Sequence, residues 1–169
     1  MPEVIPRQSA RTLVLNARKE ILLYRGIAKR SAYAWFTPGG GAFPGESLPV
    51  AAAREMREET GQVIPPEAFG PVVAVTSGTW IGDDGQRYLS TDSFFLLNVS
   101  ELTIDTSGME DLERSLIDRF RWWPLAELRS TRETVFPCDL AALLDRLLAR
   151  GAPPTPIVLP WRDFHAASS

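Results

Sequence analysis

The sequence predicts a mixed α/β domain in which helices pack against a sheet. Two observations lead to this prediction: short β-like runs alternate with turns along most of the chain, and two separate segments carry helical patterns. With 169 residues, 44% of them apolar, the chain has the length and composition of one domain with a real hydrophobic core. We therefore expect residues 1–169 to form a single domain.

The expected strands are short and bounded by turn-forming residues. They cover residues 11–16, 21–25, 32–36, 72–80, 88–99 and 116–123. Residues 103–113 are acidic and loop-like. Residues 37–41, Thr-Pro-Gly-Gly-Gly, are also expected to form a loop, because three consecutive glycines lose too much backbone freedom in a regular element.

The first expected helix covers residues 48–60. Ser47 is suited to cap its start, and Pro49 is tolerated in the first turn, where its missing N–H costs nothing. Gly61 stands where a left-handed C-terminal cap is favoured. These signals define both ends of the helix.

The second expected helix covers residues 140–150 and places its leucines on one face. Asp139 is its expected N-terminal cap, and Gly151 closes it. Four prolines then follow within residues 152–161. We expect residues 152–169 to form an extended, proline-rich strap over the domain.

Three glutamates of the first helix are spaced so that their side chains are expected to converge on one point. Glu55, Glu58 and Glu59 fall within an arc of about 100° that borders the apolar face of the helix. Two carboxylates about 4 Å apart repel each other by about 1 kcal/mol in water and about 4 kcal/mol at an effective dielectric of about 20. Arg54 is placed to pair with Glu58 and Glu46 and relieve part of this repulsion, and a divalent cation relieves more. Oxygen ligands without histidine or thiolate favour Mg²⁺, or Mn²⁺, over zinc.

Three glycines, Gly39, Gly40 and Gly41, precede the helix and form the second half of the expected site. Backbone without side chains lets a carbonyl, for example that of Gly40, join a metal shell, or lets a phosphate approach closely. A helix rich in Glu and Arg is most often a solvated face held by ion pairs one turn apart. That simpler interpretation does not explain the spacing from Gly40 to Glu46 or the glycine that ends the helix.

These residues together resemble the Nudix box, G-x5-E-x7-R-E-U-x-E-E-x-G-U, in which U is a bulky aliphatic residue. Eight of its nine fixed positions are matched, by Gly40, Glu46, Arg54, Glu55, Met56, Glu58, Glu59 and Gly61. At the ninth position stands Gln62, followed by the aliphatic Val63. That position packs and does not react. Residues 121–128 also look like the family.

The resemblance implies an α/β/α sandwich with a mixed sheet, in which the box forms a loop–helix–loop motif. It implies hydrolysis of a phosphoanhydride bond in a nucleoside diphosphate linked to another group. In the family, glutamates at the positions of Glu55, Glu58 and Glu59 bind metal. The arginine at the position of Arg54 orients them, and the glutamate at the position of Glu46 supports that network.

The general base is left open between two positions. A carboxylate takes the proton of the attacking water, which the metal activates. Glu55 is one candidate, and a glutamate of the acidic segment, Glu110 or Glu113, is the other, although both also fit plain surface charges. The expected catalytic residues are Arg54, Glu55, Glu58 and Glu113.

A nucleobase favours an aromatic platform. Trp35 and Phe36 precede the glycine loop, and with Gly39, Gly40 and Gly41 they are the expected substrate-binding residues. Further candidates are Trp80, Tyr88 and Phe94. The Pro-Gly-Gly-Gly form resembles the branch of the family that removes damaged nucleotides. It favours a nucleoside triphosphate or a nucleotide-sugar-like substrate.

The net charge of −3 disfavours stable nucleic-acid binding, which usually requires a basic face. The sequence shows no run of about 18 apolar residues and no signal-peptide core. We therefore expect a cytoplasmic protein that makes no membrane contact. We expect a monomer or homodimer whose partner is a small nucleotide substrate.

Two other classes of function remain open. A module with this fold can sense a ligand without turnover, although the intact glutamates favour turnover and no segment of helix-turn-helix size follows residue 150. A diphosphate isomerase shares the fold but needs a well-placed cysteine. The single cysteine, Cys138, lies far from the box in the sequence, which disfavours this alternative.

Overall fold

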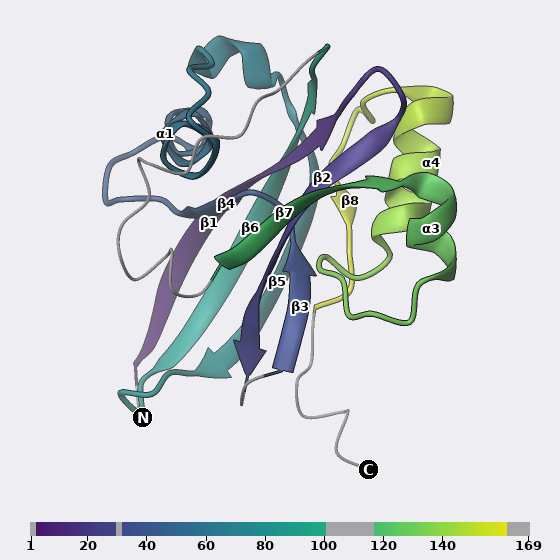
Figure 1. The fold of residues 1–169 in the computed structure, drawn as a ribbon. Coiled ribbons are helices and arrows are strands. Elements are labelled where there is room, and N and C mark those ends of the chain that lie inside the picture. Colours follow the sequence, from purple (N-terminus) through teal and green to yellow (C-terminus); the bar gives the residue numbers. More distant parts are fainter. Residues whose placement is uncertain (1–2, 30–31, 101–116, 162–169) are drawn as a thin grey trace.

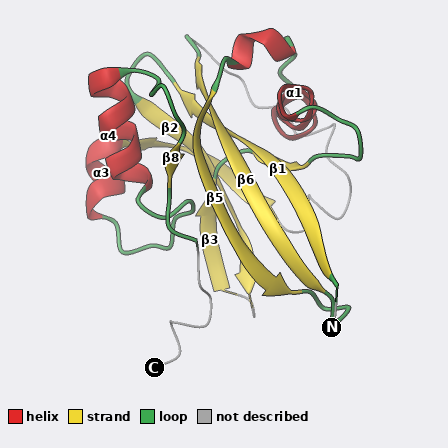
Figure 2. Ribbon diagram, turned by 180° about the vertical axis from the view of Figure 1, so that it is seen from behind, coloured by secondary structure: helices red, strands yellow, loops and turns green. Residues whose placement is uncertain are grey.

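The computed structural model describes residues 3–29, 32–100 and 117–161. Its centre is an eight-stranded sheet with parallel and antiparallel pairs. Helix α1 (Leu48–Thr60) covers one face, and α3 (Leu125–Ser130) and α4 (Leu140–Arg150) cover the other (Figures 1 and 2). This arrangement confirms the predicted α/β class and the sandwich with a mixed sheet.

The strands fall where the sequence predicts extended segments, but several are longer, and two further short strands occur. They are β1 (Val4–Leu15), β2 (Glu20–Lys29), β3 (Ala32–Phe36), β4 (Gly39–Gly41), β5 (Val72–Ile81), β6 (Arg87–Asn98), β7 (Ile117–Pro124) and β8 (Ile157–Val158). A short 3-10 helix, η1 (Pro66–Phe69), and α3 were not predicted. Residues 103–113, the expected acidic loop, lie outside the described residues.

Strand β1 is a central strand of the sheet, between β2 and β6. It pairs with β6 in parallel along its whole length, from Val4 opposite Arg87 to Leu15 opposite Asn98. It also pairs antiparallel with β4 and, at Leu15, with β2. Beyond these, β2 pairs with β3 and β7, β6 with β5, and β5 with β8. Strand β4, which we call the glycine segment (Gly39–Gly41), is therefore held directly against β1.

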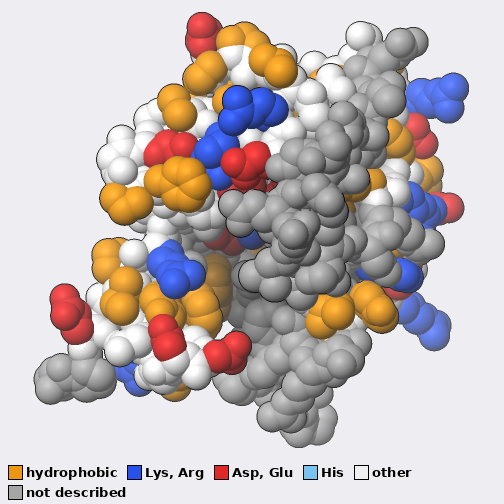
Figure 3. Space-filling model, turned by 60° about the vertical axis from the view of Figure 1, so that its left-hand side comes forward, with side chains coloured by type: hydrophobic (Ala, Val, Ile, Leu, Met, Phe, Trp, Pro, Cys, Tyr) orange, Lys and Arg blue, Asp and Glu red, His pale blue; other side chains and the backbone are white. Residues whose placement is uncertain are grey.

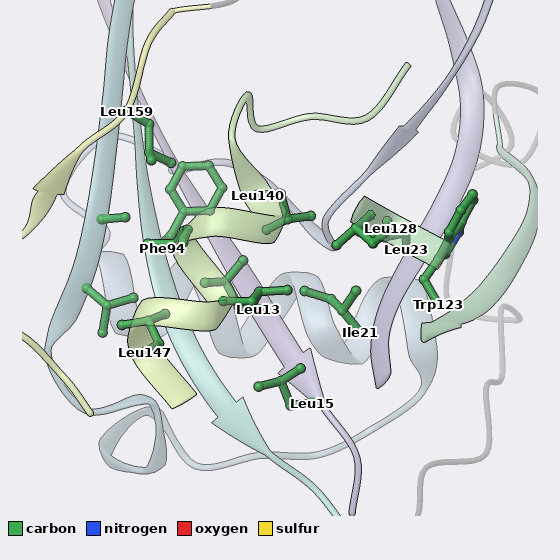
Figure 4. Close-up of a cluster of buried hydrophobic side chains, with 14 of the residues drawn as sticks. Leu13, Leu15, Ile21, Leu23, Phe94, Trp123, Leu128, Leu140, Leu147 and Leu159 are labelled. Atoms are coloured by element: carbon green, nitrogen blue, oxygen red, sulfur yellow. The ribbon is translucent and has the colours of Figure 1, made fainter. Parts of the chain in front are cut away.

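Alternate residues of β1 reach two separate hydrophobic clusters, as expected of a strand buried on both faces. Leu13 and Leu15 belong to the first cluster, together with leucines of α4 (Figure 4). Ala10 and Val14 belong to the second cluster, together with Met56 and buried alanines of α1. Helix α1 is thus anchored to β1 through its apolar face, and the neighbouring arc of the helix faces the glycine segment.

Helix α1 begins and ends where the sequence predicts. The Ser47 hydroxyl accepts a hydrogen bond from the Val50 amide at 3.4 Å. Gly61 adopts the left-handed conformation, with a φ of 77°, and its N–H donates to the Arg57 carbonyl. Both ends are therefore determined by residues in the helix and next to it.

Helix α4 also has the predicted bounds, but its predicted cap is wrong. Asp139 has a φ of 62°, whereas a capping residue has extended backbone. Its side chain makes no capping hydrogen bond within the described part of the chain. The helix is held instead by its buried leucines, which belong to the first cluster. Among the helices of the described ranges, none is long and apolar enough to cross a membrane.

The prediction that residues 37–41 form only a loop is wrong. Gly39–Gly41 form β4, which pairs with residues 9–11 of β1. A Cβ atom on Gly39 would lie 2.7 Å from the Arg11 Cα and closer still to the Ala10 carbonyl oxygen. The absence of side chains lets the two backbones approach, and the pairing outweighs the entropy that glycine loses in a strand.

Candidate active site

Arg54 joins the carboxylates of the box. Its Nε and Nη2 donate to the two carboxylate oxygens of Glu46, at 2.9 and 3.0 Å. Its Nη1 donates to Glu55 at 3.1 Å and to Glu58 at 3.3 Å. Nη2 also donates to the Gly41 carbonyl at 2.9 Å. One guanidinium therefore connects the segment before α1 to two glutamates on the helix.

Phe43 covers one side of this guanidinium. The Arg54 Cζ lies 3.9 Å from the centre of the Phe43 ring, a cation–π contact. The ring itself is 58% exposed. Figure 3 shows acidic and basic side chains side by side, with hydrophobic ones next to them, on the side of the molecule that carries α1. The network thus lies near the surface but is partly sheltered from water.

Glu55 is buried against the glycine segment. Glu55 is only 5% exposed. A Cβ atom on Gly40 would lie 2.5 Å from the Glu55 Oε1, so a side chain at this position would displace the carboxylate. Glycine at this position therefore allows the loop backbone to reach the carboxylate. The sequence predicted that Gly40 gives a metal or a phosphate access to the backbone, and that role stays a prediction.

Glu59 contacts the same segment one residue earlier. It is 3% exposed, and its Oε2 accepts a hydrogen bond from the Gly39 N–H at 3.1 Å. Glu58 is the most exposed of the three, because 27% of its side chain is accessible. The three glutamates therefore share one helix but have different surroundings.

The expected convergence of these three glutamates on one point is not seen. Across the described ranges, no three His, Cys, Asp or Glu side chains are gathered closely enough to hold a metal ion. Arg54 donates hydrogen bonds to both Glu55 and Glu58, which relieves their mutual repulsion. Glu59 instead accepts a hydrogen bond from the Gly39 N–H. The donors nevertheless fit Mg²⁺ in their chemistry, because all are oxygens and two lie within 3.3 Å of one arginine nitrogen.

Glu46 gives the network a dependence on pH. The hydrogen bonds from Arg54 lower the pKa of Glu46 below its ordinary value of 4.5. A carboxylate with a lowered pKa stabilises the folded state above its ordinary pKa. That contribution is lost as the pH falls through the lower pKa of the folded state.

We expect Glu46→Gln to reduce the free energy of unfolding by about 1 kcal/mol near neutral pH. Below the lowered pKa, where the wild-type carboxylate is protonated, we expect a smaller reduction. Urea denaturation of both proteins at the two pH values measures the difference. Equal reductions at both values would show that the charge of Glu46 has no part in stability.

A pocket lies next to the glycine segment. Thr37, two residues before Gly39, is part of its lining. Its aromatic walls are Phe36, Phe94 and Phe136, and its polar lining includes Arg11 and Asp92. The rings of Phe36 and Phe136 lie 5.5 Å apart with an angle of 35° between them. The pocket therefore combines flat apolar surfaces with one cation and one carboxylate.

Pro160 and Trp161, at the end of the segment that contains β8, form another wall of this pocket. Strand β8 pairs in parallel with β5, and the Leu159 N–H donates to the Val75 carbonyl at 2.8 Å. The Thr76 hydroxyl donates to the Pro160 carbonyl at 3.0 Å. The Trp161 ring then lies over Gly78, where a Cβ atom would overlap the indole. The segment thus runs along β5 and brings Trp161 into the pocket lining.

The predicted aromatic residues divide into three groups. Phe36 and Phe94 line the pocket. Trp35 is 1% exposed and packs in the first cluster, so it lies in the core and not in the pocket lining. The third group is Trp80 and Tyr88, which stack on each other with ring centres 4.7 Å apart.

Several residues of the site carry no sequence signal that marks them. The pocket residues missed in this way are Arg11, Asp92, Phe136 and Trp161. Cys138 was judged distant from the box by its place in the sequence, but in space it lines the same pocket as Thr37. Glu110 and Glu113 lie outside the described residues, so a role for either as general base stays a prediction.

Comparison with known proteins identifies the family. The model of the NUDIX domain matches residues 5–143. The chain therefore belongs to the Nudix family and is a hydrolase that acts on pyrophosphate bonds, which confirms the predicted enzyme class. An RNA pyrophosphohydrolase from Rickettsia conorii is 33% identical over 127 residues, which cover 70% of this chain and 74% of the relative.

Solved structures share the fold at low sequence identity. The NUDIX domain of NrtR from Shewanella oneidensis, in complex with ADP ribose, superposes with a TM-score of 0.62 at 16% identity. That match covers 88% of this chain and 90% of the other. The MutT protein from Methanosarcina mazei gives a TM-score of 0.56 at 18% identity, over 90% of this chain and 100% of the other.

Proposed function

We propose that this protein hydrolyses, with Mg²⁺, the phosphoanhydride bond of a nucleoside diphosphate linked to another group. A nucleoside triphosphate or a nucleotide-sugar-like molecule is the favoured substrate. The observation that carries the proposal is the short path from pocket to helix. Thr37 lines the pocket, and Gly39, two residues later, donates to Glu59 at 3.1 Å. A nucleotide whose base occupied the pocket would extend its phosphates along this segment toward the glutamates of α1.

The chain supplies the positions and the proton acceptor for this reaction. Glu55, Glu58 and Glu59 would hold Mg²⁺, which would neutralise phosphate charge and lower the pKa of the attacking water. Arg54 keeps two of these glutamates in place through its bonds to both. Glu55, buried beside Gly40, is the proposed acceptor of the water's proton, with Glu113 as the alternative.

The pocket suits a nucleobase. Phe36 and Phe136 offer ring faces against which a base can stack. Asp92, only 9% exposed, can accept a hydrogen bond from an amino group on the edge of a base. We propose that the protein acts in the cytoplasm, because the free thiol of Cys138 fits a reducing compartment. We also propose that it is a monomer or homodimer.

The Rickettsia relative favours a second candidate substrate. That protein is named for hydrolysis of pyrophosphate from RNA, and its match covers most of both chains. A pocket for one base accepts the first nucleotide of an RNA as well as a free nucleotide. The net charge of −3 favours the free nucleotide, because RNA binding usually draws on a basic face.

A release assay distinguishes these substrates. Phosphate, pyrophosphate and nucleotide release would be measured with Mg²⁺ and with Mn²⁺. The panel would contain nucleoside triphosphates, oxidised dGTP, ADP-ribose, nucleotide sugars, dinucleoside polyphosphates and 5′-triphosphorylated RNA. We expect metal-dependent release from a free nucleotide that Glu59→Gln abolishes. Release from RNA alone would support the second candidate. Tight binding of one ligand without release from any would indicate a sensor and overturn the proposal.

A further inference from the structure

Arg11 lies between the pocket and the glycine segment. Its Nη1 donates to the carbonyls of Thr37 and Gly39, both at 3.1 Å, and to the Tyr24 hydroxyl at 3.3 Å. Its backbone is the β1 partner of Gly39 in the ladder with β4. The same side chain lines the pocket, as does Asp92, which carries the opposite charge. Arg11 therefore holds the glycine segment by its backbone and its side chain together.

The segment that Arg11 holds is the one that contacts the buried glutamates. The Gly39 N–H donates to Glu59, while the Gly39 carbonyl accepts from Arg11. The next residue, Gly40, lies against Glu55. A shift of this peptide would therefore move the support of both carboxylates. The hydrogen bonds of Arg11 go to the Thr37 and Gly39 carbonyls and the Tyr24 hydroxyl, so they reach the two carboxylates through the backbone of this segment.

The charges around Arg11 keep this arrangement in one protonation state. Burial alone would lower its pKa, but Tyr24, Asp92 and Glu59 raise it above the ordinary value. For Tyr24, burial has the opposite effect and raises the pKa to about 12, so its hydroxyl keeps its proton at neutral pH. The guanidinium is thus a permanent cation that donates to fixed acceptors.

We propose that Arg11 is a positioning residue for the metal site, which it controls by fixing the Thr37 and Gly39 carbonyls and, through them, Glu59 and Glu55. This proposal rests on the proposed function, because it takes those glutamates to be the metal ligands. Lysine keeps the charge at this position but presents a single ammonium and not a planar fork. It cannot hold both carbonyls and the Tyr24 hydroxyl in the same geometry.

The test measures Mn²⁺ binding to the full chain by calorimetry, without nucleotide. We expect Arg11→Lys to weaken Mn²⁺ affinity about 10- to 100-fold, as loss of partners behind metal ligands typically does. Tyr24→Phe removes one acceptor and should weaken it in the same direction by less. Arg7→Lys is the matched control: Arg7 lies on the same strand, with its guanidinium 4.2 Å from the Tyr88 ring, and should bind as wild type.

A second readout separates positioning from general damage. If Arg11 acts through metal affinity, saturating Mg²⁺ restores most of the kcat of Arg11→Lys on the substrate found in the release assay. Wild-type Mn²⁺ affinity in a folded Arg11→Lys protein would overturn the proposal. If that variant does not fold, unchanged affinity in Tyr24→Phe would overturn it. Mn²⁺ affinity that Glu59→Gln leaves unchanged would instead refute the metal site itself, and with it both proposals.

Discussion

Glu59→Gln is expected to lower turnover more than about 100-fold and leave the fold intact. Glutamine keeps the size of the side chain and an oxygen that can still accept from the Gly39 N–H. It loses the negative charge on which Mg²⁺ binding depends. The expected loss exceeds the 10- to 100-fold that partners behind a metal ligand typically contribute. Steady-state rates of purified proteins, with thermal denaturation to check folding, measure it.

Two other substitutions complete this test. Glu58→Gln removes the charge of Glu58, which is more exposed than Glu59, and should lower turnover by a similar amount. Glu67→Gln is the matched control, because Glu67 lies exposed in η1 and makes no part of the proposed site. Near-normal rates in both Glu58→Gln and Glu59→Gln would remove the assignment of α1 as the metal helix.

Gly39→Ala is expected to destabilise the protein by about 2–6 kcal/mol. The backbone at Gly39 has a φ of 141°, which residues with a side chain rarely adopt. The new methyl group would also meet the backbone of Ala10 and Arg11, which cannot move without breaking the β1 ladder. Strained backbone and overpacking each cost about 1–3 kcal/mol. Urea denaturation measures the change.

Gly41→Ala is the matched control for this substitution. Gly41 belongs to the same short strand, but no described atom lies within 4 Å of a Cβ built on it. We expect its free energy of unfolding to stay within about 0.5 kcal/mol of wild type. If Gly39→Ala were equally harmless, the close approach of β4 to β1 would not be a feature of the protein in solution.

The parts of the structure that the sequence predicts are those with local signals. Ser47 and Gly61 lie at the ends of α1, and each acts within a few residues of itself, so the helix bounds are confirmed. The link from Arg54 to Glu46 and Glu58 also follows from spacing along one loop and helix. Such contacts need no knowledge of the rest of the chain.

The parts that the sequence does not predict depend on contacts between distant segments. Gly39 joins a strand only because β1 lies beside it, and three glycines in isolation favour a loop. Phe136 and Trp161 reach one pocket from segments that carry no common motif. Asp139 is a residue type that favours helix N-caps, but it lies in the turn before α4 with a left-handed backbone, and its side chain makes no capping hydrogen bond there.

The parallel pairing of β1 with β6 also has a consequence for synthesis of the protein. Leu15, the last residue of β1, and Arg87, the first of β6, are 72 positions apart (87 − 15). At about 5–20 residues per second, a ribosome needs several seconds to make that stretch. Through that time β1 lacks the neighbour that completes its ladder. A nascent chain that pauses before residue 87 holds the whole Nudix box but not yet the finished sheet beneath it.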